Sequence, residues 1–294
     1  MDTSRSFAAL CAMLCVGFAL LSCDCQQPEQ ASGDLKALTL DLGSGVTMEL
    51  MLIPPGEFLM GSPNSEAGRR GDEGPQHKVQ ITKPFYMGKS GVTQAQFEAV
   101  MGRNPAHFEG ADNPVDTVSW TDAQDFCRKL GKRASREVRL PTEAEWEYAC
   151  RAGTTTVFSF GDSAKGFGKY AWYSNNSGLK TRPVGQKKPN AWGLHDVHGN
   201  VWEWCQGWYG KDYYKGSRAS DPTGPPDGSD RVLRGGSCID EPEFCRSAIR
   251  AVAPQAGAPP STPAFVWWYP PSNPLLSLDS VLCRSCWAGA RPHS

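Results

Sequence analysis

The sequence predicts an α+β fold in which much of the chain is irregular loop. Short strands are expected first, followed by three helices with well-marked caps. Beyond Gly153 no stretch shows the apolar period of a helix, and glycines, prolines and aromatic residues divide it into short extended pieces. The 294 residues include 31 glycines, 23 prolines and 10 tryptophans, a composition typical of a loop-rich domain packed by aromatic side chains.

The strands are expected in the first part of the body. Residues 38–42 alternate leucine with polar residues, as a half-buried strand does. The apolar run 48–53 leads into a Pro-Pro-Gly turn at 54–56, and residues 58–61 follow as another short strand. These segments predict extended structure before the first helix.

Each predicted helix begins with a side chain that can cap it and ends at a glycine. The expected spans are 93–102, 119–131 and 142–153. The capping residues are Thr93, Ser119 and Thr142, with Glu145 able to reach back to Thr142. Three helices beside short strands therefore support the α+β prediction.

Composition also bounds the partners. The formal net charge is −1, and no run of lysine or arginine is long enough to grip a phosphate backbone, so nucleic acid is not an expected partner. Apolar residues make up 39% of the chain, which is enough for a sizeable core.

The N-terminal segment is typical of an export signal. Residues 7–21 are apolar, shorter than the roughly 20 residues that a spanning helix needs, and fit a secretory signal. The run ends in Leu-Leu-Ser-Cys23, which resembles a lipobox; the alternative is an ordinary cleaved signal with an incidental cysteine. We expect a signal peptide at 1–22, a polar tether at 23–36, lipid attachment at Cys23, and a membrane-anchored periplasmic or cell-surface location.

Six stretches, taken in order, resemble the formylglycine-generating-enzyme or sulfatase-modifying-factor family. They lie at 54–61, 113–120, 139–149, 193–196, 199–204 and 231–237. Any one stretch would be weak evidence, but six in the same order make the resemblance specific. It covers roughly residues 45 to 250 and implies a C-type-lectin-like fold with little regular secondary structure. We place this domain at 37–250.

The resemblance also identifies a departure at the active site. The family oxidises a sulfatase cysteine to formylglycine with molecular oxygen and a copper ion held by two cysteines. That pair has the form Cys-x-x-x-x-Cys and begins three residues after a Gly-Gly-Ser sequence. Here Ser237 and Trp202 match the family as supporting residues and Cys245 matches the second cysteine, but Asp240 stands at the first. A carboxylate cannot replace a thiolate as a soft ligand, so copper is not expected.

The sequence is therefore consistent with two functions. The first is a non-catalytic binding or structural module that presents a cleft to a protein or glycan partner. The second is a copper-dependent oxidase that generates formylglycine in sulfatases, for which the displaced Cys238 and Cys245 would have to form the redox pair. The structural alternative for Cys245 is a disulfide with Cys150. The five body cysteines are an odd number, so at least one cannot pair within that set.

The resemblance further implies calcium. The family's calcium loop matches Asp196, Gly199, Val201 and Glu203 here, and Ca²⁺ prefers such oxygen ligands. The alternative is a turn without an ion. A second, weaker calcium site matches only in part.

The residues that match the weaker site are Asn176 and the carbonyl of Gly178, whereas Trp172 stands where an oxygen-bearing side chain would be expected.

The tail at 251–294 diverges from the family, and we predict that it is read out of frame. The family ends in a strand beginning Gly-Phe-Arg-Val, which the chain lacks. The codons allowed for 263–269 permit Gly-Phe-Arg-Val-Val-Val in the neighbouring frame, which resequencing the gene would test. The alternative is a genuine divergent tail. Under the frameshift, Cys283 and Cys286, although spaced like a redox pair, carry no function.

Overall fold

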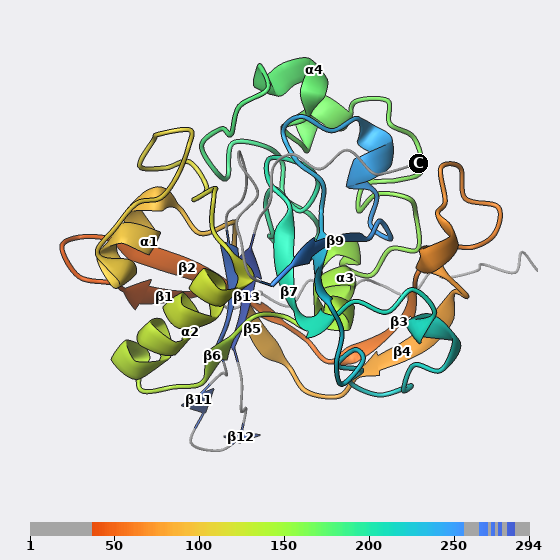
Figure 1. Cartoon of the computed structure of the whole chain (residues 1–294), viewed down its shortest axis with the longest axis horizontal. Helices are drawn as coiled ribbons and strands as arrows, with labels where there is room; N and C mark the ends of the chain where they lie inside the picture. The colour runs from red at the N-terminus through yellow and green to blue at the C-terminus, as the bar shows by residue number, and fades with distance from the viewer. Residues whose placement is uncertain (1–36, 256–264, 270–271, 274–275, 278–280, 286–294) are drawn as a thin grey trace, which may run out of the picture. The chain divides into compact units, whose positions relative to one another are not determined.

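A computed structural model of the chain describes residues 37–255, 265–269, 272–273, 276–277 and 281–285 (Figure 1). Its strands are β1 (Ala37–Asp41), β2 (Thr47–Ile53), β3 (Gly56–Met60), β4 (His77–Ile81), β5 (Phe85–Gly88), β6 (Val138–Arg139), β7 (Glu203–Trp208), β8 (Asp230–Arg234), β9 (Ala251–Pro254), β10 (Phe265–Tyr269), β11 (Ser272–Asn273), β12 (Leu276–Ser277) and β13 (Val281–Ser285). Its α-helices are α1 (Gln94–Met101), α2 (Trp120–Ala134), α3 (Glu143–Arg151) and α4 (Ser174–Ser177). Short 3-10 turns are η1 (Gly71–Glu73), η2 (Phe167–Lys169), η3 (Tyr213–Lys215) and η4 (Pro242–Cys245). The predicted α+β class is confirmed.

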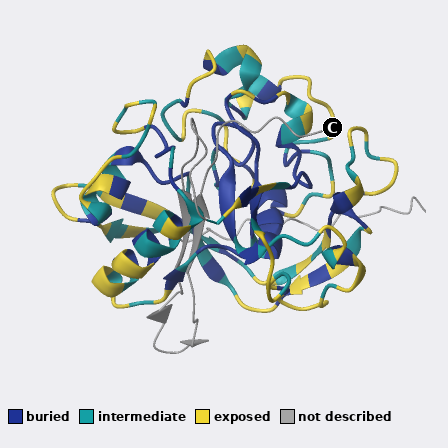
Figure 2. Cartoon of the chain, viewed as in Figure 1, coloured by how far each residue is buried: buried dark blue, intermediate teal, exposed yellow. Residues whose placement is uncertain are grey.

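The strands form open sheets. The largest sheet in the described part of the chain has the order β1-β2-β5-β10-β13-β6, and β3 pairs with β4 in a separate ribbon. β7, β8 and β9 form an antiparallel sheet in which Glu203 lies opposite Arg234. Figure 2 shows that α3 and β7 lie in the buried centre, where Trp146 and Trp204 are fully enclosed. The site loops described below extend from the ends of β7 and β8.

The predicted helix starts are confirmed by their hydrogen bonds. Thr93, Ser119 and Thr142 each accept a hydrogen bond from the backbone N–H three residues later, and each helix has a complete capping box. The predicted end of α1 is also correct, since Gly102 closes it in the left-handed conformation. Local side-chain chemistry was sufficient to place these starts.

The predicted end of α2 is wrong. The helix continues through Gly131 to Ala134, and Ser135 closes it in the left-handed conformation. A Cβ on Gly131 would lie 2.8 Å from the Arg136 carbonyl oxygen, so the glycine permits a close approach of the following chain within a continuing helix. α3 similarly closes at Ala152, one residue before the predicted Gly153.

Strands lie beyond the domain boundary expected at residue 250. β9 pairs with β8, and β10 pairs with β5 through Trp268 opposite Met87. The reading frame of this segment stays a prediction. Cys286 lies outside the described residues.

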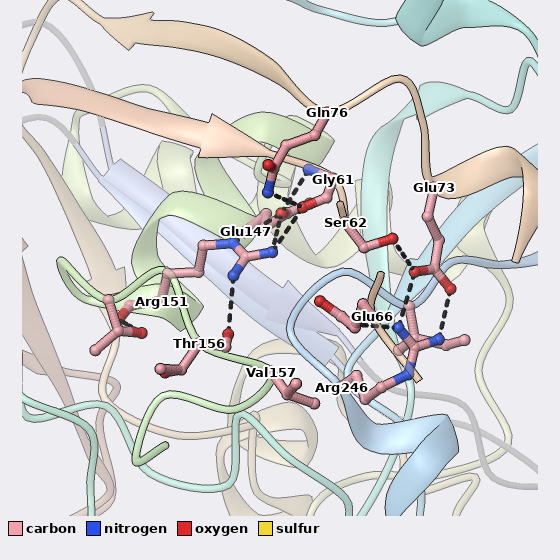
Figure 3. A network of polar contacts seen from close by, with 12 residues as sticks. Gly61, Ser62, Glu66, Glu73, Gln76, Glu147, Arg151, Thr156, Val157 and Arg246 are labelled. Atoms are coloured by element: carbon pink, nitrogen blue, oxygen red, sulfur yellow. Dashed lines mark hydrogen bonds and ion pairs between the residues drawn. The ribbon is translucent and has the colours of Figure 1, made fainter. Parts of the chain in front are cut away.

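A buried network of ion pairs joins the first half of the chain to the last (Figure 3). Arg151 donates to Glu147 at 2.9 Å and to the Gly61 carbonyl at 2.9 Å. Arg246 donates to both carboxylate oxygens of Glu73, at 2.8 and 2.6 Å. Burial alone would raise the pKa of Glu73, but the hydrogen bond and charge of Arg246, together with hydrogen bonds from Ser62 and Arg70, hold that pKa below its ordinary value. Arg246 follows Cys245 directly, so this network fixes η4 in place.

The membrane-related predictions concern another part of the chain. No helix within the described residues is long and apolar enough to cross a membrane. The apolar run 7–21, Cys23 and the tether 23–36 lie outside the described residues, so the lipid anchor stays a prediction.

Candidate functional site

The candidate site is the loop that follows β8 and leads through η4. Gly236 lies at its start with φ of +79°, and a Cβ there would be 2.4 Å from the Cys245 sulfur. Only glycine accommodates both the backbone angle and the contact. The Gly-Gly-Ser sequence therefore brings Ser237 and Cys245 into one compact turn.

Ser237 and Asp240 form the polar centre of this loop. The Ser237 hydroxyl donates to Asp240 Oδ2 at 2.6 Å, and the Asp240 N–H donates to the Ser237 carbonyl at 3.2 Å. Ser237 is completely buried, and burial raises the pKa of Asp240 to about 6. At neutral pH the position predicted for a first thiol thus holds a buried carboxylate satisfied by a hydroxyl.

The two nearby thiols are poor candidates for ionisation. Burial, followed by the charge of Asp240, raises the pKa of Cys238 to about 12. The same two causes, in the same order, raise the pKa of Cys245 well above its ordinary range. Thiolates, not thiols, bind metals and act as nucleophiles. Without a bound metal, both thiols are therefore protonated at neutral pH.

The predicted disulfide between Cys150 and Cys245 is not formed. Both are buried thiols in the structure, and no disulfide links the five cysteines between residues 127 and 245. Cys150 packs in the main core, where its sulfur lies 3.9 Å from the Val197 carbonyl oxygen. Cys245 packs in a separate cluster with Phe158 and Phe167. The prediction failed because the two residues belong to different apolar clusters.

His198 ties this site to a neighbouring loop. Its ring nitrogens lie 2.7 Å from the Cys245 carbonyl oxygen and 2.9 Å from the Ser159 hydroxyl. The Ser159 N–H donates to Nε2, so Nδ1 carries the proton and donates to Cys245. His198 therefore positions the η4 segment, a role that sequence inspection missed.

The predicted calcium loop is a buried turn made of oxygen donors. Asp196 Oδ2 accepts the Gly185 N–H at 2.8 Å, and Glu203 Oε2 accepts the Trp146 indole N–H at 2.5 Å. The Gly199 carbonyl accepts the Val201 N–H at 2.8 Å. The two buried carboxylates and two backbone carbonyls of this loop are oxygen ligands of the type that Ca²⁺ takes. Calcium binding by this loop stays a prediction, and no group of three or more His, Cys, Asp or Glu side chains in the described residues is arranged to hold a metal ion.

The weaker predicted site does not fit a dication. Asn176 uses both ends of its amide locally, accepting the Tyr173 N–H and donating to the Ala171 carbonyl. Lys187 places its ammonium 3.7 Å from the centre of one Trp172 ring and donates to the Gly168 carbonyl at 2.7 Å.

A second cation reaches the same segment, because Arg182 Nε donates to the Ser177 carbonyl at 2.6 Å. A Cβ on Gly178 would lie 2.9 Å from this guanidinium. Arg182 therefore stands beside Gly178 and Lys187 beside Trp172, and the positive charge of both side chains opposes a further cation there.

The fold and this loop are those of a sulfatase-modifying-factor protein. The chain matches the family described as "Sulfatase-modifying factor enzyme 1-like domain" over residues 44–262, and it belongs to that family.

Its relatives include formylglycine-generating enzymes. One from Streptomyces coelicolor is 32% identical, over 71% of this chain and 84% of that protein. Another from Bos taurus is 30% identical, over 67% of each. Among solved structures, Treponema denticola variable protein 1 has a TM-score of 0.69 at 29% identity, covering 85% of this chain and 98% of that one. PvdO from Pseudomonas aeruginosa has a TM-score of 0.67 at 25% identity, with the same coverage.

Proposed function

We propose that this chain is an exported, lipid-anchored family member that works as a calcium-stabilised binding or structural module and not as an oxidase. The observation that carries the proposal is Asp240, a buried carboxylate held by Ser237 at the position where the family resemblance places the first active-site thiol. A carboxylate is neither a soft ligand nor a redox group.

The surrounding residues support the same conclusion. Cys245 keeps the second position of the pair, but its thiol is buried and its pKa is raised. The loop is held by its glycine turn and by the His198 contact to the Cys245 carbonyl. A firmly held loop with a carboxylate in place of the first thiol suits binding of a protein or glycan partner better than redox catalysis.

The oxidase remains the second candidate because Cys238 lies in the same loop. Burial is the largest cause of the raised pKa of Cys245, and the charges of Asp240 and Cys238 add to it, so the three groups are electrostatic neighbours. A Cys238–Cys245 copper pair would therefore need two thiolates next to a carboxylate, an arrangement that like charges disfavour.

Copper(I) binding in a competition assay under reducing conditions tests the proposal. We expect wild type to bind no more copper(I) than Cys245→Ala. Asp240→Cys restores the family spacing with Cys245 and is expected to gain a site that Asp240→Cys/Cys245→Ala lacks. Copper(I) binding by wild type that Cys245→Ala abolishes would favour the oxidase.

A further inference from the structure

Positive charge is concentrated on one short segment of the domain. Residues 128–136 contain five lysine or arginine side chains and no acidic one, in a chain whose formal net charge is −1. The five residues are Arg128, Lys129, Lys132, Arg133 and Arg136, which together are called the α2 basic face. The charge elsewhere is correspondingly negative, so the domain is electrically asymmetric.

The structure places most of this charge in solvent. Ala123, Phe126, Cys127 and Leu130 are buried on the opposite side of α2. Arg128, Lys129, Lys132 and Arg133 are exposed, and Figure 2 shows the exposed stripe along α2 at the lower left. The helix is therefore amphipathic, with cations making up much of the outer surface of its C-terminal half.

The α2 basic face also has a concave part. An open hollow of about 410 Å³ lies between α2 and β6, lined by Arg128, Lys132 and Arg136 together with Gln124 and Glu137. Arg128 makes an exposed ion pair of 2.7 Å with Asp125, and pairs of this kind contribute little to stability. The hollow brings three cationic side chains around a space that suits a phosphate group.

The hollow lies on a domain whose tether is short. Arg133 donates to the carbonyls of Leu42 and Ala99, at 3.0 and 2.9 Å, which holds the end of α2 beside the segment that follows β1. β1 begins at Ala37, and the tether 23–36 spans at most roughly 50 Å when fully extended. A chain anchored at Cys23 therefore keeps the α2 basic face within reach of the bilayer.

We propose that the α2 basic face binds the phosphate headgroups of the anionic membrane to which Cys23 anchors the chain. This inference rests on the proposed lipid anchor. Lysine and arginine near an anionic surface are attracted to it, and the attraction weakens with salt. Figure 1 shows α2 at the lower left and α4, which contacts the Asp240 loop, at the top. Docking through α2 would leave that loop accessible to a partner.

Lysine labelling of the anchored full chain tests this surface. The chain is reconstituted into vesicles of phosphatidylcholine, with or without phosphatidylglycerol, and acetylated with a water-soluble reagent before mass spectrometry. We expect Lys129 and Lys132 to react about fivefold more slowly in the anionic vesicles. The exposed Lys165 and Lys180 serve as controls and should react equally in both. High salt should remove the protection.

The outcomes separate the steps of the inference. Arg128→Glu should abolish the protection, whereas the matched Lys165→Glu should keep it. Equal labelling in both vesicle types would overturn the docking surface and leave the anchor intact. Protection by dissolved inorganic phosphate in neutral vesicles would show a free-anion site and overturn the headgroup assignment. A chain that fails to enter vesicles would overturn the anchor and, with it, this proposal.

Discussion

The Ser237 hydroxyl donates a 2.6 Å hydrogen bond to the Asp240 carboxylate in the loop after β8. The carboxylate is buried there, and its pKa is raised to about 6. A hydroxyl donor offsets only part of the cost of burying a charge. Asp240 therefore makes the stability of this loop depend on pH. It occupies the position where the family resemblance places the first active-site thiol.

The first prediction concerns that pH dependence. Because the folded pKa of Asp240, about 6, exceeds the ordinary value of 3.8, the folded state binds the proton more tightly than the unfolded state. Ionisation of Asp240 therefore lowers the free energy of unfolding as pH rises from about 4 to about 6, and this loss persists above pH 6. We expect Asp240→Asn to be more stable than wild type at pH 7.5, by on the order of 1–3 kcal/mol, and to lose this advantage near pH 4.

Urea unfolding of both proteins at the two pH values measures this difference. Other carboxylates, such as Glu73, titrate in both proteins and cancel in the comparison. An Asp240→Asn effect of the same size at both pH values would contradict the raised pKa.

A second prediction tests the glycine turn. Gly236→Ala should destabilise the domain by several kcal/mol, because its Cβ would overlap the Cys245 sulfur. Gly45→Ala is the matched control: its φ is +77° against +79° for Gly236, but a Cβ there meets nothing within 4 Å. The control should lose only about 1–2 kcal/mol from backbone strain. Equal losses in chemical denaturation would show that the contact with Cys245 is unimportant.

A third prediction concerns calcium. Calcium should raise the melting temperature of wild type, since an ion that binds only the folded state stabilises it by about 2.7 kcal/mol at 100 times its Kd. Asp196→Ala and Glu203→Ala should each abolish the shift, whereas Asn176→Ala should keep it, because the segment around Asn176 is served by protein cations. The loop is only a turn if a chelator leaves the wild-type melting temperature unchanged.

Lys187 provides a fourth prediction. Burial lowers the pKa of Lys187 and the negative charge of Asp196 opposes that shift, so the ammonium acts as a counter-charge to Asp196 in the predicted calcium loop. Lys187→Met should therefore lower stability without calcium and strengthen calcium binding, measured by calorimetry. Lys188→Met, at an exposed neighbouring position, is the control. Unchanged calcium affinity in Lys187→Met would rule out competition between the ammonium and the ion.

Local features of the fold were accessible from the sequence. Thr93 and Ser119 cap their helices through hydrogen bonds to residues three positions away, and such contacts depend on neighbours in the chain. The end of α2 was not accessible, because the role of Gly131 depends on where the chain folds back after the helix. Short-range chemistry could be predicted, but the packing of distant segments could not.

In the candidate site, too, short-range features could be predicted from the sequence and long-range contacts could not. The spacing after Gly-Gly-Ser was enough to predict Asp240 at the first thiol position, and the structure shows how Ser237 holds it. The contact between His198 and Cys245 spans 47 residues and leaves no pattern in the sequence. The disulfide prediction failed for the same reason, since it required knowing which apolar cluster encloses Cys245.

The most direct test of the non-catalytic account is an aldehyde assay on a peptide that carries the sulfatase cysteine motif. The purified chain, supplied with copper and oxygen, is incubated with the peptide, and formylglycine is measured by mass spectrometry against a no-enzyme control. With Asp240 at the first thiol position, we expect wild type to give no aldehyde above the control. Formylglycine that is produced by wild type and lost in Cys245→Ala would contradict the account.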